Sequence, residues 1–160
     1  MTNPRYPLRI NVGFLIHSPI GTNHDFEFDL PVAELSEDLI LTELKGKARI
    51  SRTQQGLLVE GDFSAQVPQD CVRCLAGFNQ YVSADFDELY AFRYRRNPES
   101  ELFVPEDGQI DLAPLVRDYL ILELPIMPIC NESCKGLCPL CGANLNETEC
   151  EHAGKPDNDL

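Results

Sequence analysis

Apolar and polar residues alternate along three consecutive stretches of the chain, which is the pattern of half-buried β-strands. Residues 42–51 place small or apolar side chains at every second position, with charged side chains between them. The alternation resumes in residues 57–67 and again in residues 78–92, with a hairpin loop at 52–56. These strands and short links predict an antiparallel β-meander. A shorter strand pair is expected from residues 8–16 and 26–30.

The period changes between residues 111 and 122, where apolar side chains recur at helical spacing. Asp111 is a suitable N-cap, and Pro114 is tolerated in the first turn of a helix. The apolar positions are Leu112, Leu115, Val116, Tyr119 and Leu120. We expect this helix to pack on the sheet, which predicts a mainly β (α+β) fold with a meander or barrel-like sheet and one packed helix.

The chain has 160 residues, of which 43% are hydrophobic, enough for a packed core. The pattern predicts an antiparallel β domain over residues 1–128 that contains the helix. A cysteine-rich appendage is expected at 129–152, followed by a flexible tail at 153–160. The acidic stretch 97–109 is expected to form a loop.

Five of the seven cysteines lie close together near the C-terminus, and a histidine follows them. Cys138-Pro-Leu-Cys141-Gly142 is a turn that can point two thiolates at one cation, with glycine providing the positive φ. An odd number of clustered cysteines in a chain without a secretory signal favours metal over disulfides. The candidate ligands are Cys130, Cys134, Cys138, Cys141, Cys150 and His152. The pattern predicts a zinc-knuckle appendage with structural zinc.

Tetrahedral zinc needs four ligands, and the spacing allows more than one set. The preferred set is Cys134, Cys138, Cys141 and Cys150, with Cys130 and His152 in reserve. A further Cys-x2-Cys pair, Cys71 and Cys74, is expected at the tip of the hairpin between the second and third strands. An alternative arrangement joins Cys71 and Cys74 to Cys138 and Cys141, which would attach the appendage to the sheet.

Two other thiol chemistries remain open. Cys134-x3-Cys138-x2-Cys141 has the spacing that holds a [4Fe–4S] cluster in some enzymes, so an iron–sulfur protein is an alternative. A redox switch, in which oxidised thiols release zinc, is the other. The chain has only three histidines and no Ser-His-Asp pattern or phosphate-binding glycine loop, and these features disfavour an enzyme.

The net charge of −13 restricts the partners that the protein can bind. Nucleic acids are bound mainly by Lys and Arg, and the chain has 13 of these against 26 acidic residues. DNA binding is therefore not expected, and direct RNA binding stays uncertain. A basic partner such as a ribosomal protein suits an acidic chain. With neither a membrane-spanning run nor a signal sequence, the cytoplasm is the expected location.

Two motifs together resemble the bacterial YceD family. Cys71-Val-Arg-Cys74-Leu lies upstream, and Cys134-Lys-Gly-Leu-Cys138-Pro-Leu-Cys141-Gly lies downstream after Leu-Glu-Leu-Pro-Ile-Met-Pro. The resemblance covers residues from about 35 to 152. It implies a non-enzymatic role in accumulating or processing large-subunit ribosomal RNA, through a basic ribosomal protein or the precursor subunit. It also implies that metal binding is a stabilising accessory.

The chain departs from the family pattern at its C-terminal end. Members often close the cysteine-rich tail with Cys-x-Cys, whereas this chain has Cys150-Glu-His152. Histidine is an acceptable zinc ligand, so His152 remains a candidate.

Overall fold

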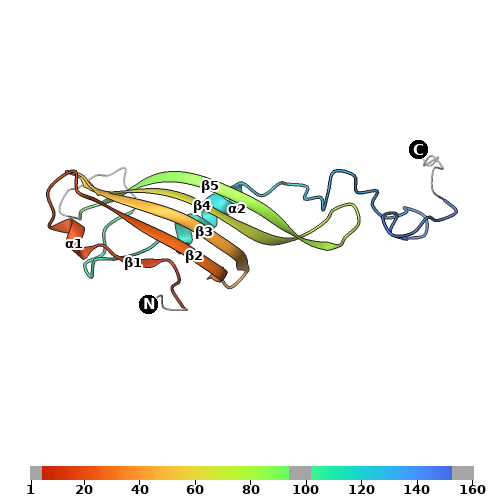
Figure 1. Cartoon of the computed structure of the whole chain (residues 1–160), viewed down its shortest axis with the longest axis horizontal. Helices are drawn as coiled ribbons and strands as arrows, with labels where there is room; N and C mark the ends of the chain where they lie inside the picture. Colours follow the sequence, from red (N-terminus) through yellow and green to blue (C-terminus); the bar gives the residue numbers. More distant parts are fainter. Residues whose placement is uncertain (1–4, 94–101, 153–160) are drawn as a thin grey trace. The chain divides into compact units, whose positions relative to one another are not determined.

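The computed structural model of the protein describes residues 5–93 and 102–152 (Figure 1). Within them the chain divides into two compact units. The first contains residues 5–67, 81–93 and 102–123, and the second contains residues 68–80 and 124–152. The boundaries expected at 128 and 152 stay predictions, and the second unit also takes in the segment 68–80. The predicted tail at 153–160, and part of the predicted loop at 97–109, lie outside the described residues.

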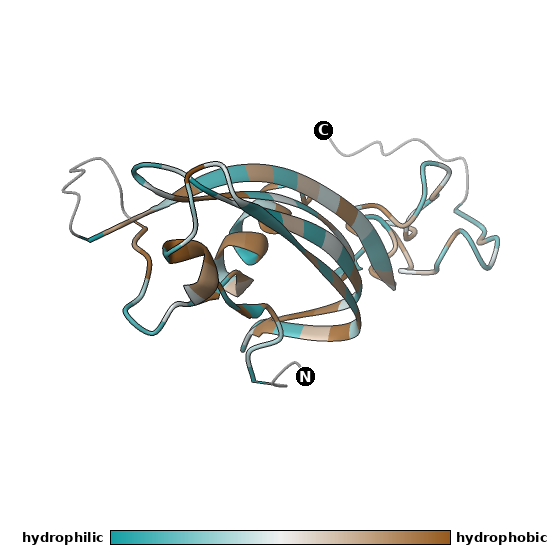
Figure 2. Cartoon of the chain, turned by 60° about the vertical axis from the view of Figure 1, so that its left-hand side comes forward, coloured by the Kyte–Doolittle hydropathy of each residue, from teal (hydrophilic) through white to brown (hydrophobic). Residues whose placement is uncertain are grey.

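Four long strands form an antiparallel meander, as the alternation predicts. They are β2 (Asn23–Ser36), β3 (Leu39–Arg52), β4 (Gly56–Asp70) and β5 (Gly77–Ala91), and they are neighbours in chain order. Within the described residues the sheet is open, with β2 and β5 as its edges, so it does not close into a barrel. Figure 2 shows hydrophilic and hydrophobic residues alternating along these strands.

Two glycines in the sheet make room for aromatic rings in the core. Gly46 on β3 is opposite Phe28 on β2 and Phe63 on β4, and a Cβ at Gly46 would lie 2.2 Å from the Phe63 ring. A Cβ at Gly61 would lie 2.5 Å from the ring of Phe86. Each glycine thus lies beneath a ring, and the rings of Phe63 and Phe86 stack with their centroids 6.1 Å apart. This row of rings forms the centre of the first unit.

The predicted helix is confirmed as α2 (Ala113–Leu122), which lies against one face of the sheet (Figure 1). Tyr119 stacks on Phe86 with 4.8 Å between ring centroids, and its hydroxyl donates to Glu88 Oε1 at 2.5 Å. Asp111 acts just outside the helix, because its Oδ1 accepts from the Ala113 N–H at 3.0 Å. The helix therefore begins two residues after the predicted start.

The predicted pairing of residues 8–16 with 26–30 is wrong. Residues 8–16 hold a short strand, β1 (Arg9–Asn11), and a short helix, α1 (Gly13–Ile16), and β1 pairs with β6 (Gln109–Asp111). The Asn11 side chain accepts from the Gly13 N–H at 2.9 Å, which turns the chain out of the strand. Residues 26–30 belong to β2, which continues through Pro31 because an edge strand tolerates a missing N–H.

Candidate metal centres

Cys71 and Cys74 lie at the tip of the β4–β5 hairpin, as predicted. The tip is closed by two backbone hydrogen bonds, from the Cys71 N–H to the Ala76 carbonyl and from the Leu75 N–H to the Cys71 carbonyl, both at 2.9 Å. Leu75 has a φ of 61°, an uncommon conformation for a residue with a side chain. The tight turn points both thiols to the same side.

The C-terminal segment brings two further thiols to this tip. The Val72 N–H donates to the Pro128 carbonyl at 2.9 Å, and the Leu137 N–H donates to the Arg73 carbonyl at 3.0 Å. Between these two attachment points lie Cys130 and Cys134. We call Cys71, Cys74, Cys130 and Cys134 the first thiol group, and their Sγ atoms all lie within 4.8 Å of one another.

The sulfur spacing of the first thiol group fits a single tetrahedral ion. Cys71 Sγ lies 3.8 Å from Cys134 Sγ, and Cys74 Sγ lies 3.7 Å from Cys130 Sγ. Four thiolates at the usual zinc–sulfur distance of about 2.3 Å would place their sulfurs about 3.8 Å apart. All seven cysteines of the chain are free thiols. The group therefore has the number, type and spacing of ligands that a structural zinc ion requires.

The environment of the first thiol group prepares part of it for the thiolate form. Burial raises the pKa of Cys71, but hydrogen bonds from the backbone at Cys74, Cys130 and Arg73 outweigh this and bring it to about 6. The Asn146 side chain, whose Nδ2 lies 3.3 Å from Cys134 Sγ, lowers the pKa of Cys134. Burial and the neighbouring thiols raise the pKa of Cys130 to about 12. Four crowded thiols thus cannot all ionise unless a cation lies between them.

The second thiol group consists of Cys138, Cys141, Cys150 and His152, whose ligand atoms also lie within 4.8 Å of one another. Its turn is closed by the Gly142 N–H donating to the Cys138 carbonyl at 2.8 Å. Gly142 has a φ of 76°, which confirms the positive φ expected at this position. Hydrogen bonds from the backbone at Cys141 and Leu140 lower the pKa of Cys138 to about 6.

His152 completes the second thiol group. Within the part of the chain that the structure describes, its Nδ1 is the single buried side-chain nitrogen or oxygen atom without a hydrogen-bond partner. An imidazole nitrogen beside three thiols is a normal zinc ligand, and an ion there would satisfy it. The donor set of three thiols and one imidazole therefore fits a tetrahedral metal ion.

The structure groups the expected ligands differently from the preferred set. Cys138, Cys141 and Cys150 come together, but Cys134 belongs to the other group, and the reserve residue His152 takes the fourth place. Cys71 and Cys74 are joined by Cys130 and Cys134, whereas the alternative arrangement paired them with Cys138 and Cys141. Sequence spacing identified the candidates but left their partition open.

Asn146 is a site residue that the sequence analysis missed. Its Oδ1 accepts from the Lys135 N–H at 2.8 Å while its amide approaches the Cys134 sulfur. It thereby fixes the turn between the two groups, in which Gly136 has a φ of 78°. An isolated asparagine in a polar stretch carries no periodic signal, so only its proximity to the sulfur reveals this role.

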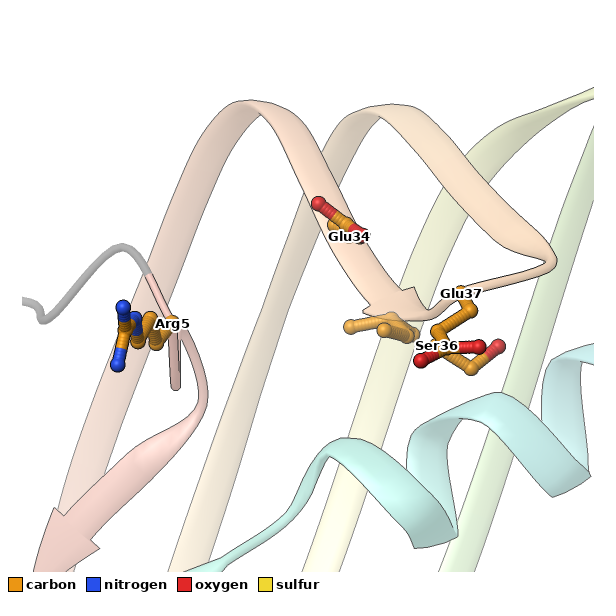
Figure 3. Close-up of a pocket in the computed structure, with 5 residues that line it drawn as sticks. Arg5, Glu34, Ser36 and Glu37 are labelled. Atoms are coloured by element: carbon orange, nitrogen blue, oxygen red, sulfur yellow. The ribbon is translucent and has the colours of Figure 1, made fainter.

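Two open hollows lie elsewhere in the described residues. One, of about 260 Å³, is in the first unit and is lined by Arg5, Glu34, Leu35, Ser36 and Glu37 (Figure 3). The other, of about 380 Å³, is in the second unit at the base of the hairpin tip and is lined by Pro68, Gln69, Asp70, Gly77, Phe78 and Asn79. The first hollow combines carboxylates with one guanidinium, and its described lining residues form no group of metal ligands.

Comparison with known proteins assigns the family. The sequence profile described as "Large ribosomal RNA subunit accumulation protein YceD" matches residues 59–160, a span that contains both thiol groups. The chain belongs to the YceD family. The match confirms the resemblance that the two cysteine motifs indicated.

Several relatives of this YceD-family chain share the same region. An uncharacterized protein of Mycobacterium leprae is 33% identical over 101 residues, which is 61% of this chain and 46% of that protein. The uncharacterized protein YlbN of Bacillus subtilis is 32% identical over 130 residues, or 71% of each chain. "Large ribosomal RNA subunit accumulation protein YCED homolog 1, chloroplastic" of Arabidopsis thaliana is 44% identical over 57 residues, 36% of this chain and 17% of that protein.

The chain spans about half the length of the mycobacterial relatives it matches. No solved structure matches it. Among the helices of the described residues, each is too short or too polar to cross a membrane.

Proposed function

We propose that this YceD-family protein is a non-enzymatic factor in ribosome biogenesis that supports the accumulation or processing of large-subunit (23S-type) ribosomal RNA in the cytoplasm. The family match over residues 59–160 carries this proposal, because the family's description and the names of the plant relatives refer to large-subunit ribosomal RNA accumulation. These descriptions name no chemical reaction, which agrees with a role in assembly.

Two structural zinc ions are part of the proposal, one in each thiol group. Each group offers four protein ligands, so a tetrahedral ion would keep no open position for a substrate or a water molecule. Such closed sites stabilise a fold, whereas catalytic zinc keeps one position open. The zinc ions would therefore hold the second unit together without taking part in a reaction.

The sulfur spacing supports a single ion per group over an iron–sulfur cluster. In the first thiol group the closest sulfurs are 3.7 and 3.8 Å apart, the separation that one central ion gives. In a cluster of several irons, cysteine sulfurs bound to different irons lie farther apart, whereas all four ligand atoms of each thiol group lie within 4.8 Å of one another. The geometry thus favours one mononuclear ion per group over a cluster, and a closed set of four protein ligands suits structural zinc.

The net charge of −13 indicates a basic protein or the precursor subunit's protein surface as the partner. The charges on the exposed face of the sheet also favour a protein partner over RNA. Two cations on this face, Arg49 and Lys47, both pair with Asp25, at 2.8 and 3.3 Å. This pairing reduces the positive charge that the face offers to phosphates.

Removal of the gene from its own host tests the function. The expected result is a lower ratio of large-subunit to small-subunit ribosomal RNA, with precursor particles visible on sucrose gradients. The wild-type chain should restore the ratio, and so should the control variant Ser133→Ala, which alters an exposed hydroxyl beside Cys134. A deletion strain with unchanged large-subunit ribosomal RNA would show that the proposed function is wrong.

A further inference from the structure

The second unit exposes apolar side chains on segments that are rigidly held. Ile126 is 99% exposed and Met127 is 70% exposed, between two prolines that restrict the backbone. At the hairpin tip, Leu75 is 67% exposed and Val72 is 45% exposed. Exposed apolar side chains that gather on ordered segments are a common feature of interaction sites.

The two segments that carry these side chains are held together. The hydrogen bond from the Val72 N–H to the Pro128 carbonyl places the hairpin tip beside the proline-flanked segment. Phe78 and Ile129 pack against the first thiol group from the two segments. We call Val72, Leu75, Ile126 and Met127 the apolar patch. Because its backbone is fixed before any partner arrives, little conformational entropy remains to be lost on binding.

Leu75 holds its side chain in water at a conformational cost. Its φ of 61° belongs to the left-handed region, where glycine or asparagine is the usual residue. The turn alone would be more stable with glycine. A leucine at this position is explained when its side chain contacts something outside the chain.

The charge and lining of the adjacent hollow indicate the chemistry of the partner. The hollow at the base of the same hairpin tip has a volume of about 380 Å³ and is lined by the apolar Pro68 and Phe78 and by the carboxylate of Asp70. Asp70 Oδ1 lies above Gly77, 3.8 Å from where a Cβ would be. Apolar walls suit the aliphatic stem of a lysine or arginine, and the carboxylate suits its charged end.

The second unit as a whole has a net negative charge, the same sign as the carboxylate of Asp70. Its described residues include five carboxylates, at Asp70, Glu132, Glu147, Glu149 and Glu151, and two cations, Arg73 and Lys135. Arg73 is engaged internally, because its Nη1 donates to the Cys134 carbonyl at 3.1 Å. Phosphate backbones would be repelled, and a cationic protein segment would be attracted.

We propose that the apolar patch, together with the adjacent hollow at Asp70 and Phe78, is a docking surface for a cationic protein segment that carries apolar side chains. The proposal rests on the proposed function, which places such segments among the proteins of the large ribosomal subunit. The patch residues supply the buried contact, and Asp70 receives one lysine or arginine. Affinity comes from the apolar contact, and the carboxylates set the choice of partner.

The test measures binding of the full, zinc-loaded chain to individually purified large-subunit proteins and, in parallel, to protein-free ribosomal RNA from the same subunits. We expect tight binding to one or more basic proteins. Leu75→Gly and the double variant Ile126→Ser/Met127→Ser should each weaken it at least about tenfold, the loss that removal of ~1.4 kcal/mol of contact produces. Leu75→Gly is informative because glycine accepts the positive φ, so folding is not impaired.

Two further variants test whether the effect is specific to the patch and how much the Asp70 ion pair contributes to binding. Val32→Ser removes a side chain that is 63% exposed on β2 in the first unit, and we expect it to bind like the wild type. Asp70→Asn should weaken binding and reduce its dependence on salt, because one ion pair is lost. Metal content and far-ultraviolet circular dichroism of each variant show whether the fold is intact.

Several results would overturn the proposal. These are wild-type affinity in both patch variants, equal loss in Val32→Ser, binding to the RNA alone, binding to neither probe, or a dimer that the patch variants convert to a monomer. Complementation in the deletion strain separates this proposal from the proposed function. If the patch variants restore large-subunit ribosomal RNA as well as the wild type does, the patch assignment fails and the function stands. If the deletion itself has no effect, the function fails.

Discussion

The two units of the protein are stabilised by different means. In the first unit, buried side chains such as Phe63, Leu44 and Ile50 form an apolar core, and rings stack across the sheet. In the described part of the second unit, every buried apolar side chain is a cysteine: Cys71, Cys74, Cys134 and Cys138. A unit whose interior is thiols has little hydrophobic stabilisation of its own, so we expect its fold to depend on metal ions held by the two thiol groups.

Metal removal should produce the largest difference between the two units. Structural zinc in small peptides contributes about 10–16 kcal/mol of apparent binding free energy at pH 7. After chelation we expect hydrogen exchange to become fast at amides of the second unit such as Leu137 and Cys138. Amides of β3 such as Ala48 should stay protected. Equal loss of protection in β3 would show that the units are not independently stable.

Single cysteine variants should show that the second unit holds two metal ions in separate sites. The wild type should bind two zinc ions, and Cys134→Ser should leave one, held by Cys138, Cys141, Cys150 and His152. Cobalt substitution would then report a site of three thiolates and one imidazole. Complete loss of metal in Cys134→Ser would instead support one site made of Cys134, Cys138, Cys141 and Cys150. The control Ser133→Ala should keep both ions.

A core substitution should destabilise the first unit and leave the metal content of the second unit unchanged. Phe63 is 1% exposed, so Phe63→Ala should lower the free energy of unfolding of the first unit by about 3–5 kcal/mol, measured by urea denaturation. The zinc content should stay at two ions per chain. Val32→Ala, at an exposed position, should change the free energy by less than about 0.5 kcal/mol. Loss of zinc in Phe63→Ala would contradict the separation.

Substitution of Gly61, the glycine beneath Phe86, should have a smaller effect on the stability of the first unit. In Gly61→Ala the new Cβ would lie 2.5 Å from Phe86 Cζ, so the ring must move, at a cost of about 1–3 kcal/mol. Gly77→Ala is the matched control, because its Cβ would meet only Asp70 Oδ1 at 3.8 Å. Thermal denaturation of the two variants should therefore differ. Similar melting temperatures would show that the sheet relaxes around the added methyl group.

The smallest expected effect is the response of the first unit to alkaline pH. Burial raises the pKa of Tyr90 to about 12, above its value of about 10 in an unfolded chain. This stabilisation of the neutral phenol is complete below pH 10 and is lost as the pH rises through 12. Tyr90→Phe should decline less in stability between pH 10 and 12. An ultraviolet titration in which all tyrosines ionise near pH 10 would contradict the shift.

The sequence predicted the elements that have many repeats of one pattern. Fourteen- and fifteen-residue strands such as β3 and β4 repeat the period-2 alternation several times, and α2 repeats a helical one. β1 and β6 have three residues each, too few to show a period, and their pairing joins segments about a hundred residues apart. Such a contact depends on tertiary packing that local pattern does not encode.

The same limit applies to the metal centres. Sequence proximity identified Cys71 with Cys74 and Cys138 with Cys141, because each pair lies in one turn. It favoured Cys134 as a neighbour of Cys138, yet the structure turns the chain at Gly136 and places Cys134 with the distant hairpin tip. The decisive contacts are backbone hydrogen bonds, from the Val72 N–H to the Pro128 carbonyl and from the Leu137 N–H to the Arg73 carbonyl. Such bonds form whatever the side chains are, so the residue types do not reveal them.

The two thiol groups are completed at different stages of translation. In the first group, Cys74 and Cys130 are 56 residues apart and Cys71 and Cys134 are 63 apart, so two thiols leave the ribosome long before their partners. The second group spans residues 138–152 and can assemble almost as soon as it is made. If the first thiol group binds the proposed ion, its half at the hairpin tip is an incomplete ligand set during synthesis, and Cys71 and Cys74 are open to oxidants or to another metal until Cys130 and Cys134 have been translated.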